Sequence, residues 1–133
     1  APMLFAKAAV NNETIKVFNY GNQKRDFTHI NDIVNAIFLL TNCFKVKIKK
    51  AELVNIGNGL PTNLLDFIVT IEKSIGVKLL QEFVGEQLGD VAETYADDTN
   101  LKLLIGERSK TSLNDGVVEF INWYKNYYEN FNY

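Results

Sequence analysis

Several residue types that stabilise or specialise small proteins are scarce in this chain of 133 residues. Its single cysteine, Cys43, has no partner for an internal disulfide, as is usual in a reducing cytoplasm. It has one histidine, and no Cys/His cluster has the ligand spacing of a metal site. No apolar run approaches the length of a membrane span, and nothing resembles a signal peptide. We therefore expect a cytoplasmic protein without a membrane segment or a metal site.

The chain also lacks the motifs of cofactor binding and nucleophilic catalysis. No glycine-rich turn of the Gly-x-Gly-x-x-Gly type is present to hold a dinucleotide pyrophosphate, and no Gly-x-Ser-x-Gly elbow occurs. Tyr20 and Lys24 have the Tyr-x-x-x-Lys spacing of a dehydrogenase pair, but that pair needs a helix, and the residues between them are typical of a turn. We expect no catalytic and no cofactor-binding residue in this chain.

Charge and composition are those of an ordinary globular domain. The formal net charge is −2, which argues against a general nucleic-acid binder. The basic cluster, four lysines within residues 45–50, alternates with apolar residues and is interpreted as a solvated loop or strand edge. With 47% hydrophobic and 23% charged residues, the chain can bury one modest core, so we expect a single domain over residues 1–133.

Hydrophobic periodicity predicts alternating helices and strands, which is typical of the α/β class. Helices are expected over 3–10, after a cap at Asn31 or Asp32, between a cap at Thr62 and Gly76, over 99–105, and from Asn114 or Asp115 onward. Strands are expected over 15–19, 25–30, 52–56 and 77–84. The first predicted helix begins at the start of the chain with no capping residue before it, which suggests missing upstream sequence.

Residues 85–98 form the longest segment without periodicity, and such segments in compact domains are often functional. It contains Gln87, Asp90 and Asp97, whose amide and carboxylate groups suit the hydroxyls of a sugar or ribose. For Asp90 the alternative is a turn residue. For Asp97 the favoured alternative is a cap for the helix that follows.

Arg25 is one of two arginines and begins a predicted strand. A guanidinium held there can bind a phosphate through two parallel hydrogen bonds. The alternative is a salt bridge with Asp26 or another surface acid. The single histidine, His29, lies in a strand-like run and is expected to be structural.

Six separated blocks together resemble the extended short-chain dehydrogenase/reductase family, and within it the nucleotide-sugar epimerases and UDP-glucuronate 4-epimerases. The blocks are VFNYG at 17–21 with RDFT at 25–28 and DIV at 32–34, NIGN at 55–58, Gln87-x-Gly89-Asp90-Val91, TYAD at 94–97, KT at 110–111 with DGV at 115–117, and Phe120 with Trp123-Tyr124. They occur in the family's order and cover nearly the whole chain. The resemblance implies the carboxy-terminal, substrate-binding part of such an enzyme, lacking most of the Rossmann half.

The resemblance also implies roles for individual residues. Arg25 matches the arginine that binds the diphosphate of a UDP-sugar, and Asp90 matches the acid that holds the ribose hydroxyls. Gln87 falls near the same phosphates. Lys16 and Phe18 match positions whose main chain lines the uracil.

The implied parent enzyme inverts C4 of a UDP-hexuronate or UDP-hexose by transient oxidation with NAD, in polysaccharide biosynthesis. NAD and the catalytic Tyr-x-x-x-Lys would belong to the missing half, so the chain alone is expected to be inactive. Two alternatives remain: a non-catalytic nucleotide-binding module, and part of a related nucleotide-sugar dehydratase or reductase. The parent is expected to be a homodimer. The fragment is expected to self-associate through apolar surface that the Rossmann half would cover.

Overall fold

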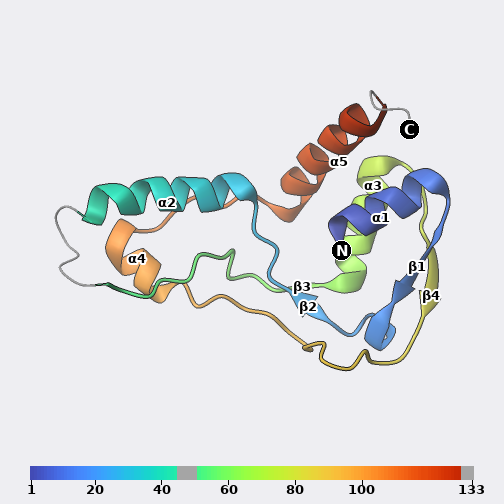
Figure 1. Cartoon of the computed structure of the whole chain (residues 1–133), viewed down its shortest axis with the longest axis horizontal. Helices are drawn as coiled ribbons and strands as arrows, with labels where there is room; N and C mark the ends of the chain where they lie inside the picture. Colours follow the sequence, from blue (N-terminus) through green and yellow to red (C-terminus); the bar gives the residue numbers. More distant parts are fainter. Residues whose placement is uncertain (45–50, 130–133) are drawn as a thin grey trace.

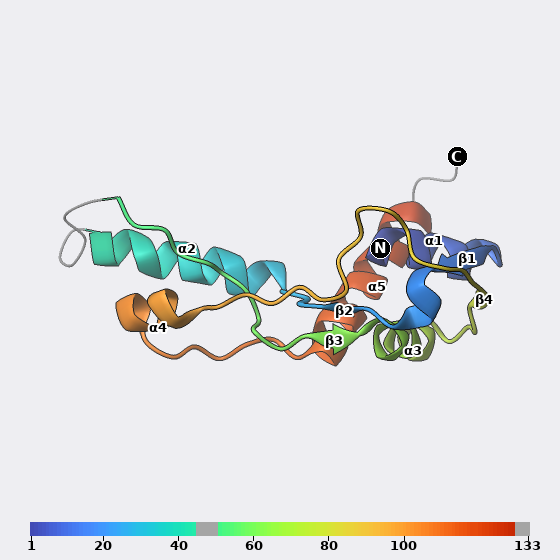
Figure 2. The ribbon, with the colours of Figure 1, turned by 90° about the horizontal axis from the view of Figure 1, so that it is seen from below.

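The computed structural model describes residues 1–44 and 51–129, so the predicted loop or strand edge at 45–50 lies outside the described residues. Two groups of elements lie at opposite ends of an elongated molecule and are joined by extended segments (Figures 1 and 2). The elements are, in order, α1 (Pro2–Asn11), β1 (Thr14–Val17), the 3-10 turn η1 (Phe18–Gly21), β2 (Lys24–Arg25), α2 (Ile30–Phe44), β3 (Thr62–Asn63), α3 (Leu64–Ile75), β4 (Leu80–Phe83), α4 (Thr99–Ile105) and α5 (Leu113–Glu129).

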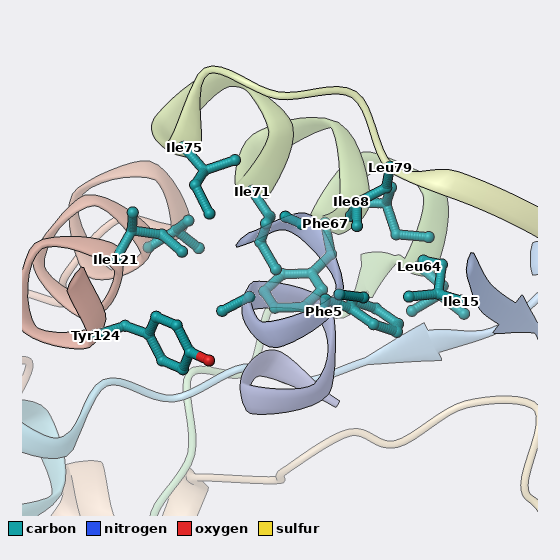
Figure 3. Packing of buried hydrophobic residues seen from close by; sticks show 14 of the residues in the cluster. Phe5, Ile15, Leu64, Phe67, Ile68, Ile71, Ile75, Leu79, Ile121 and Tyr124 are labelled. Atoms are coloured by element: carbon teal, nitrogen blue, oxygen red, sulfur yellow. The ribbon is translucent and has the colours of Figure 1, made fainter. Parts of the chain in front are cut away.

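The larger end holds the main hydrophobic core. Strands β1 and β4 pair in parallel, with Ile15 opposite Gln81. Helix α3 lies at the centre and contributes Phe67, Ile68 and Ile71, each at most 2% exposed, to the packing against α1 and α5 (Figure 3). This arrangement confirms the α/β class and anchors both strands that lead toward the middle of the molecule.

The smaller end is a thin layer in which α2 packs on α4. Ala36 and Leu40 of α2 and Leu101 of α4 form its buried centre, with Val54 and Ile56 of the extended segment packed against them. Because few elements cover α2, only one side of its apolar surface is buried. Three apolar residues elsewhere on α2 are at least half exposed: Val34, Ile37 and Phe38.

Most of the predicted helices and turns are confirmed. Helix α4 occupies 99–105 as predicted, and α3 ends at Gly76, whose φ of 82° is the left-handed conformation that favours glycine. Helix α1 ends at Asn12, also left-handed with φ 56°. Residues 85–98 contain no helix or strand longer than a single bridge.

Two predicted helix caps are wrong. Helix α2 begins at Ile30, and the carboxylate of Asp32 instead accepts two hydrogen bonds from Thr111, at 2.9 and 3.0 Å. Helix α3 is capped by Asn63, whose side chain accepts from the N–H of Leu65 at 2.9 Å. In α2 the predicted capping side chain, Asp32, binds a residue distant in sequence. In α3 the cap is the residue after the predicted one. Residue spacing alone does not reveal either outcome.

Two predicted strands are also wrong or much shorter. Of the predicted strand at 25–30, only Arg25 lies in a strand, β2 (Lys24–Arg25), which pairs antiparallel with β3. Residues 52–56 form no strand in the described structure, and Leu53 is 86% exposed. A strand requires a neighbouring strand in register, and among the described residues no strand pairs with residues 52–56.

Candidate functional site

A cluster of three polar side chains lies between the two ends of the molecule. The guanidinium of Arg25 donates from Nη2 to Oδ1 of Asp90 at 2.6 Å, and the amide of Gln23 donates to Oδ2 of the same carboxylate, also at 2.6 Å. The amide oxygen of Gln23 accepts from Arg25 at 3.3 Å. Residues 65 positions apart in sequence therefore meet in one network.

Backbone pairing fixes the position of this cluster. Lys24 pairs on one side with Asn63 of β3. On its other side, its N–H donates to Ala92 at 2.9 Å, and its carbonyl accepts from Thr94 at 3.1 Å. The irregular segment that carries Asp90 is thus hydrogen-bonded to β2, next to Arg25. Side chains alternate along a strand, so residues 23 and 25 point to the same side.

The turn η1 connects this cluster to the core through an unusual backbone. Asn19, Tyr20 and Gly21 have φ values of 49°, 51° and 82°, which for two non-glycine residues in succession is strained. The turn is held because the N–H groups of Asn19 and Tyr20 donate to Gly85 and Val84 at 3.2 and 3.1 Å. It is therefore tied to the start of the loop that carries Asp90.

The observed turn agrees with the rejection of Tyr20 and Lys24 as a catalytic pair. Tyr20 is 61% exposed on the turn, and Lys24 is exposed on β2. The two residues lie on different elements, and no helix joins them.

A small pocket of about 450 Å³ lies next to the cluster. It is lined by Asp26 and Thr28 and by the segments 54–57 and 94–96. Asp26 organises it: one carboxylate oxygen accepts from the N–H groups of Gly59 and Ala96, at 2.9 and 3.1 Å. The N–H of Asp26 in turn donates to Thr94 at 3.0 Å. Asp26 is thus engaged with the backbone, which leaves Arg25 to pair with Asp90.

A second charged network fixes the end of the irregular segment. Asp98 is 7% exposed and accepts from Lys110 at 2.8 Å, with Lys102 at 3.3 Å. The hydrogen bond from Lys110 lowers the pKa of the Asp98 carboxyl, against burial that raises it. Sequence reasoning missed this network, because nothing in the sequence distinguishes Asp98 from the neighbouring Asp97.

The cap predicted at Asp97 is one residue off, because Asp98 occupies the cap position of α4 and its side chain makes no capping hydrogen bond; Asp97 nevertheless contacts the start of the helix. Its carboxylate accepts from the N–H and the hydroxyl of Thr99, at 3.0 and 2.6 Å, at the start of α4. These bonds lower the pKa of the exposed Asp97 carboxyl. Asp97 therefore binds the first residue of α4 from just outside the cap position.

The remaining predicted site residues lie around the cluster but outside it. Gln87 is exposed, and its carbonyl accepts from the N–H of Asp90 at 3.0 Å, which shapes the turn. Lys16 is exposed on β1 opposite Glu82, and Phe18 is half-buried at the start of η1. The structure thus joins Arg25 with Asp90 directly, and adds Gln23, which sequence reasoning did not select.

His29 lies away from this cluster. Its Nε2 is 3.3 Å from the carboxylate of Glu119 on α5, and its ring packs on Gly116. The ring lines an apolar pocket of about 500 Å³ together with Phe120 and Trp123. It connects the start of α2 to α5, as expected of a structural residue.

The described residues do not fit a dinucleotide or a metal ion. The two glycines of the 57–59 loop are the nearest approach to a glycine-rich turn, but a Cβ on Gly57 would lie 2.2 Å from that of Ala96. The space beside that glycine is filled by protein. Over residues 1–44 and 51–129, no group of three or more His, Cys, Asp or Glu side chains is placed to hold a metal ion. Within the same ranges, no helix has the length and apolar character of a membrane span.

The fold is that of the extended short-chain dehydrogenase/reductases. Residues 1–57 match the NAD dependent epimerase/dehydratase family. UDP-glucuronic acid 4-epimerase from Bacillus cereus, in complex with UDP-glucuronic acid and NAD, superposes with a TM-score of 0.78 at 26% identity. That match covers 93% of this chain and 40% of that one.

Two curated relatives extend the match along the chain. Protein CapI of Staphylococcus aureus is 36% identical over 94% of this chain and 42% of its own length. The probable UDP-glucuronate 4-epimerase of Rhizobium meliloti is 32% identical over 93% of this chain and 41% of its own length. The chain therefore spans about two fifths of these relatives. The resemblance to the NAD-dependent nucleotide-sugar epimerase/dehydratase family, expected from the sequence, is confirmed.

Proposed function

We propose that residues 1–133 form the carboxy-terminal, nucleotide-sugar-binding domain of an enzyme that inverts C4 of a UDP-hexuronate or UDP-hexose. The relatives from Rhizobium meliloti and Thermodesulfobacterium geofontis, both named UDP-glucuronate 4-epimerases, support this assignment. So does the Bacillus cereus structure, which contains UDP-glucuronic acid and NAD. A place in polysaccharide biosynthesis, which the resemblance implies, is part of the proposal.

The meeting of Arg25 and Asp90 is the observation that carries the proposal. Their ion pair is only partly exposed, at 23% and 34% of the side chains, so a solute can reach it while neighbouring protein limits its hydration. A guanidinium fork suits a diphosphate, and a carboxylate suits the hydroxyls of a ribose. A UDP-sugar presents both groups close together, and so matches the two side chains.

Binding requires an exchange of partners. Nη1 of Arg25 donates to the carbonyls of Lys24 and Ala92, and Nη2 donates to Asp90 and Gln23. A diphosphate would take over the bond to Asp90, and the ribose would occupy the acceptor that Arg25 leaves. The ion pair thus holds both side chains close together before the ligand arrives.

The main chain near η1 completes the proposed site. Lys16 and Phe18 would line the uracil through their backbone, and Gln87 would lie near the phosphates. The strained turn next to them is tied to the loop of Asp90, so the base and the ribose would be held by connected segments. The sugar itself would be held loosely, which C4 inversion needs because the sugar must present both faces.

NAD would be bound by a part of the enzyme outside this chain, because the described glycines do not form its cradle. NAD would accept the hydride, and this chain would bind the nucleotide part of the substrate. Binding energy from the non-reacting part of a substrate is a common means of positioning the reacting part. The isolated chain is therefore expected to bind UDP but neither to bind NAD nor to catalyse epimerisation.

Isothermal titration of UDP into the protein tests this proposal. Arg25→Ala is expected to raise the dissociation constant by about tenfold or more, since a hydrogen bond to a charged group contributes about 1.5–3 kcal/mol. Arg108→Ala is the matched control, because the guanidinium of Arg108 donates to the carbonyl of Asp32 and lies outside the cluster of Arg25, Gln23 and Asp90. Equal affinity in Arg25→Ala and the wild type would remove Arg25 from the site, and no UDP binding by the wild type would contradict the proposed function.

A further inference from the structure

Gln23 is a buried polar residue at the centre of the proposed site that no assigned role explains. It is 7% exposed, and its carbonyl accepts from the first N–H of α3, that of Leu64, at 2.8 Å. Its side chain donates to Asp90 at 2.6 Å and accepts from Arg25 at 3.3 Å. A buried amide with both ends hydrogen-bonded is fixed in orientation, since losing either bond leaves an unsatisfied group.

The bonds on Asp90 show what this fixed amide does. A carboxylate has about four acceptor sites, two on each oxygen. Oδ1 accepts from Arg25 at 2.6 Å and from the N–H of Val91 at 3.1 Å, and Oδ2 accepts from Gln23. If Arg25 turns to a diphosphate, the carboxylate keeps one protein donor on each oxygen. One free acceptor site then remains on each oxygen, which matches the two hydroxyls of a cis-diol.

We propose that Gln23 is a positioning residue that orients Asp90 for bidentate binding of the ribose 2′,3′-diol, and so sets a preference for ribonucleotides. The inference rests on the proposed function of the site. Val91 alone holds only one oxygen, so the carboxylate could rotate about that bond. Gln23 donates to the second oxygen, Oδ2. With both oxygens bound by protein donors, the carboxylate keeps its orientation toward the ligand when Arg25 binds the diphosphate.

Titrations with UDP and 2′-deoxy-UDP test the inference. The wild type is expected to bind UDP more tightly than the deoxy analogue. Gln23→Met keeps the side-chain length but removes both hydrogen bonds. It should weaken UDP binding by about tenfold and bring the ratio of the two dissociation constants close to one. The matched control is Gln81→Met on β4, which should keep the wild-type ratio.

A double-variant cycle separates positioning from a structural effect. If Gln23 acts through Asp90, Gln23→Met combined with Asp90→Asn should lose no more affinity than Asp90→Asn alone. Gln23→Glu keeps the volume of the side chain and places a second acceptor beside Asp90. Gln23→Glu should also abolish the preference for UDP over 2′-deoxy-UDP. It replaces Gln23→Met in the test if that variant does not fold.

The outcomes distinguish the two proposals. No binding of UDP by the wild type would overturn both. If the wild type prefers UDP and Asp90→Asn removes that preference, but Gln23→Met and Gln23→Glu retain it, only the role of Gln23 fails. Additive losses in the double variant would likewise assign Gln23 an effect independent of Asp90 and overturn the inference.

Discussion

Two acidic residues of the irregular segment, Asp90 and Asp98, are both ion-paired but differ in exposure. The side chain of Asp90 is 34% exposed, whereas that of Asp98 is 10% exposed between Lys102 and Lys110. A ligand can therefore compete for the first pair. The second is shielded from solvent, where the attraction between charges is stronger. We infer that Asp98 holds the segment in place so that Asp90 faces the site.

Asp98→Asn is expected to lower the free energy of unfolding at neutral pH by about 2 kcal/mol, because it removes a charged partner of two lysines. The change is measured by urea denaturation at pH 7. Asp66→Asn, at an exposed position in the first turn of α3, is the control and should cost about 0.5 kcal/mol through the helix dipole.

The same pair makes a prediction for acid. The hydrogen bond from Lys110 lowers the pKa of Asp98 below its ordinary value of 3.8. A lowered pKa means that the stabilisation is present above the unfolded value and is lost as pH falls through the folded one. The difference between wild type and Asp98→Asn should therefore shrink below about pH 4. A constant difference down to pH 2 would contradict the role of the ion pair.

At the scale of elements, the turn η1 determines how the core is joined to the site. Gly21 ends it with a φ of 82°, and a Cβ there would lie 2.6 Å from Cδ2 of Leu65 on α3. The turn therefore needs glycine for its conformation and for the close approach of α3. Gly76 has the same φ but open space around it. Comparing the two glycines therefore distinguishes the cost of the backbone conformation from the cost of the steric clash.

Gly76→Ala is expected to cost about 1–2 kcal/mol of stability, the penalty for an alanine in the left-handed region. Gly21→Ala should cost at least about 1 kcal/mol more, because the methyl group also displaces the packed side chain of Leu65. Thermal unfolding of both variants checks the order. Equal losses would show that Leu65 moves aside freely and that close packing at η1 is unimportant.

At the scale of the whole molecule, the smaller end leaves much apolar surface uncovered. Val34, Ile37 and Phe38 on α2 are 56%, 50% and 63% exposed, and Leu53 on the neighbouring segment is 86% exposed. These positions suit a contact with further protein. In the proposed enzyme that protein is the Rossmann half, whereas in the isolated chain a second copy can take its place.

The isolated chain is therefore expected to self-associate, with an average mass that rises with concentration in light scattering. Phe38→Lys should shift the association to concentrations about tenfold higher or more, because it places a charge on the apolar face. Leu88→Lys is the control, since Leu88 is fully exposed on a loop. A monomer at every concentration, or unchanged association in Phe38→Lys, would contradict this expectation.

The local features of the fold were predictable from the sequence because they depend on neighbours along the chain. Apolar spacing and Gly76 placed α3, and the same reasoning placed α4. Predictions that depended on a distant partner were less successful. The strand at 52–56 was wrong, and the cap predicted at Asp32 was wrong because Thr111 binds that carboxylate.

The candidate site likewise has a part that the sequence predicts and a part that depends on tertiary contacts. Residue chemistry, and the blocks that resemble the epimerase family, were enough to select Arg25 and Asp90 as a fork and an acceptor. That they contact each other, with Gln23 behind them, depends on β2 pairing with residues 92–94, a contact between segments about 65 positions apart. Sequence patterns encode which side chains are available and how each segment folds locally. Only the packed backbone decides which of them meet, because that depends on every segment lying between them.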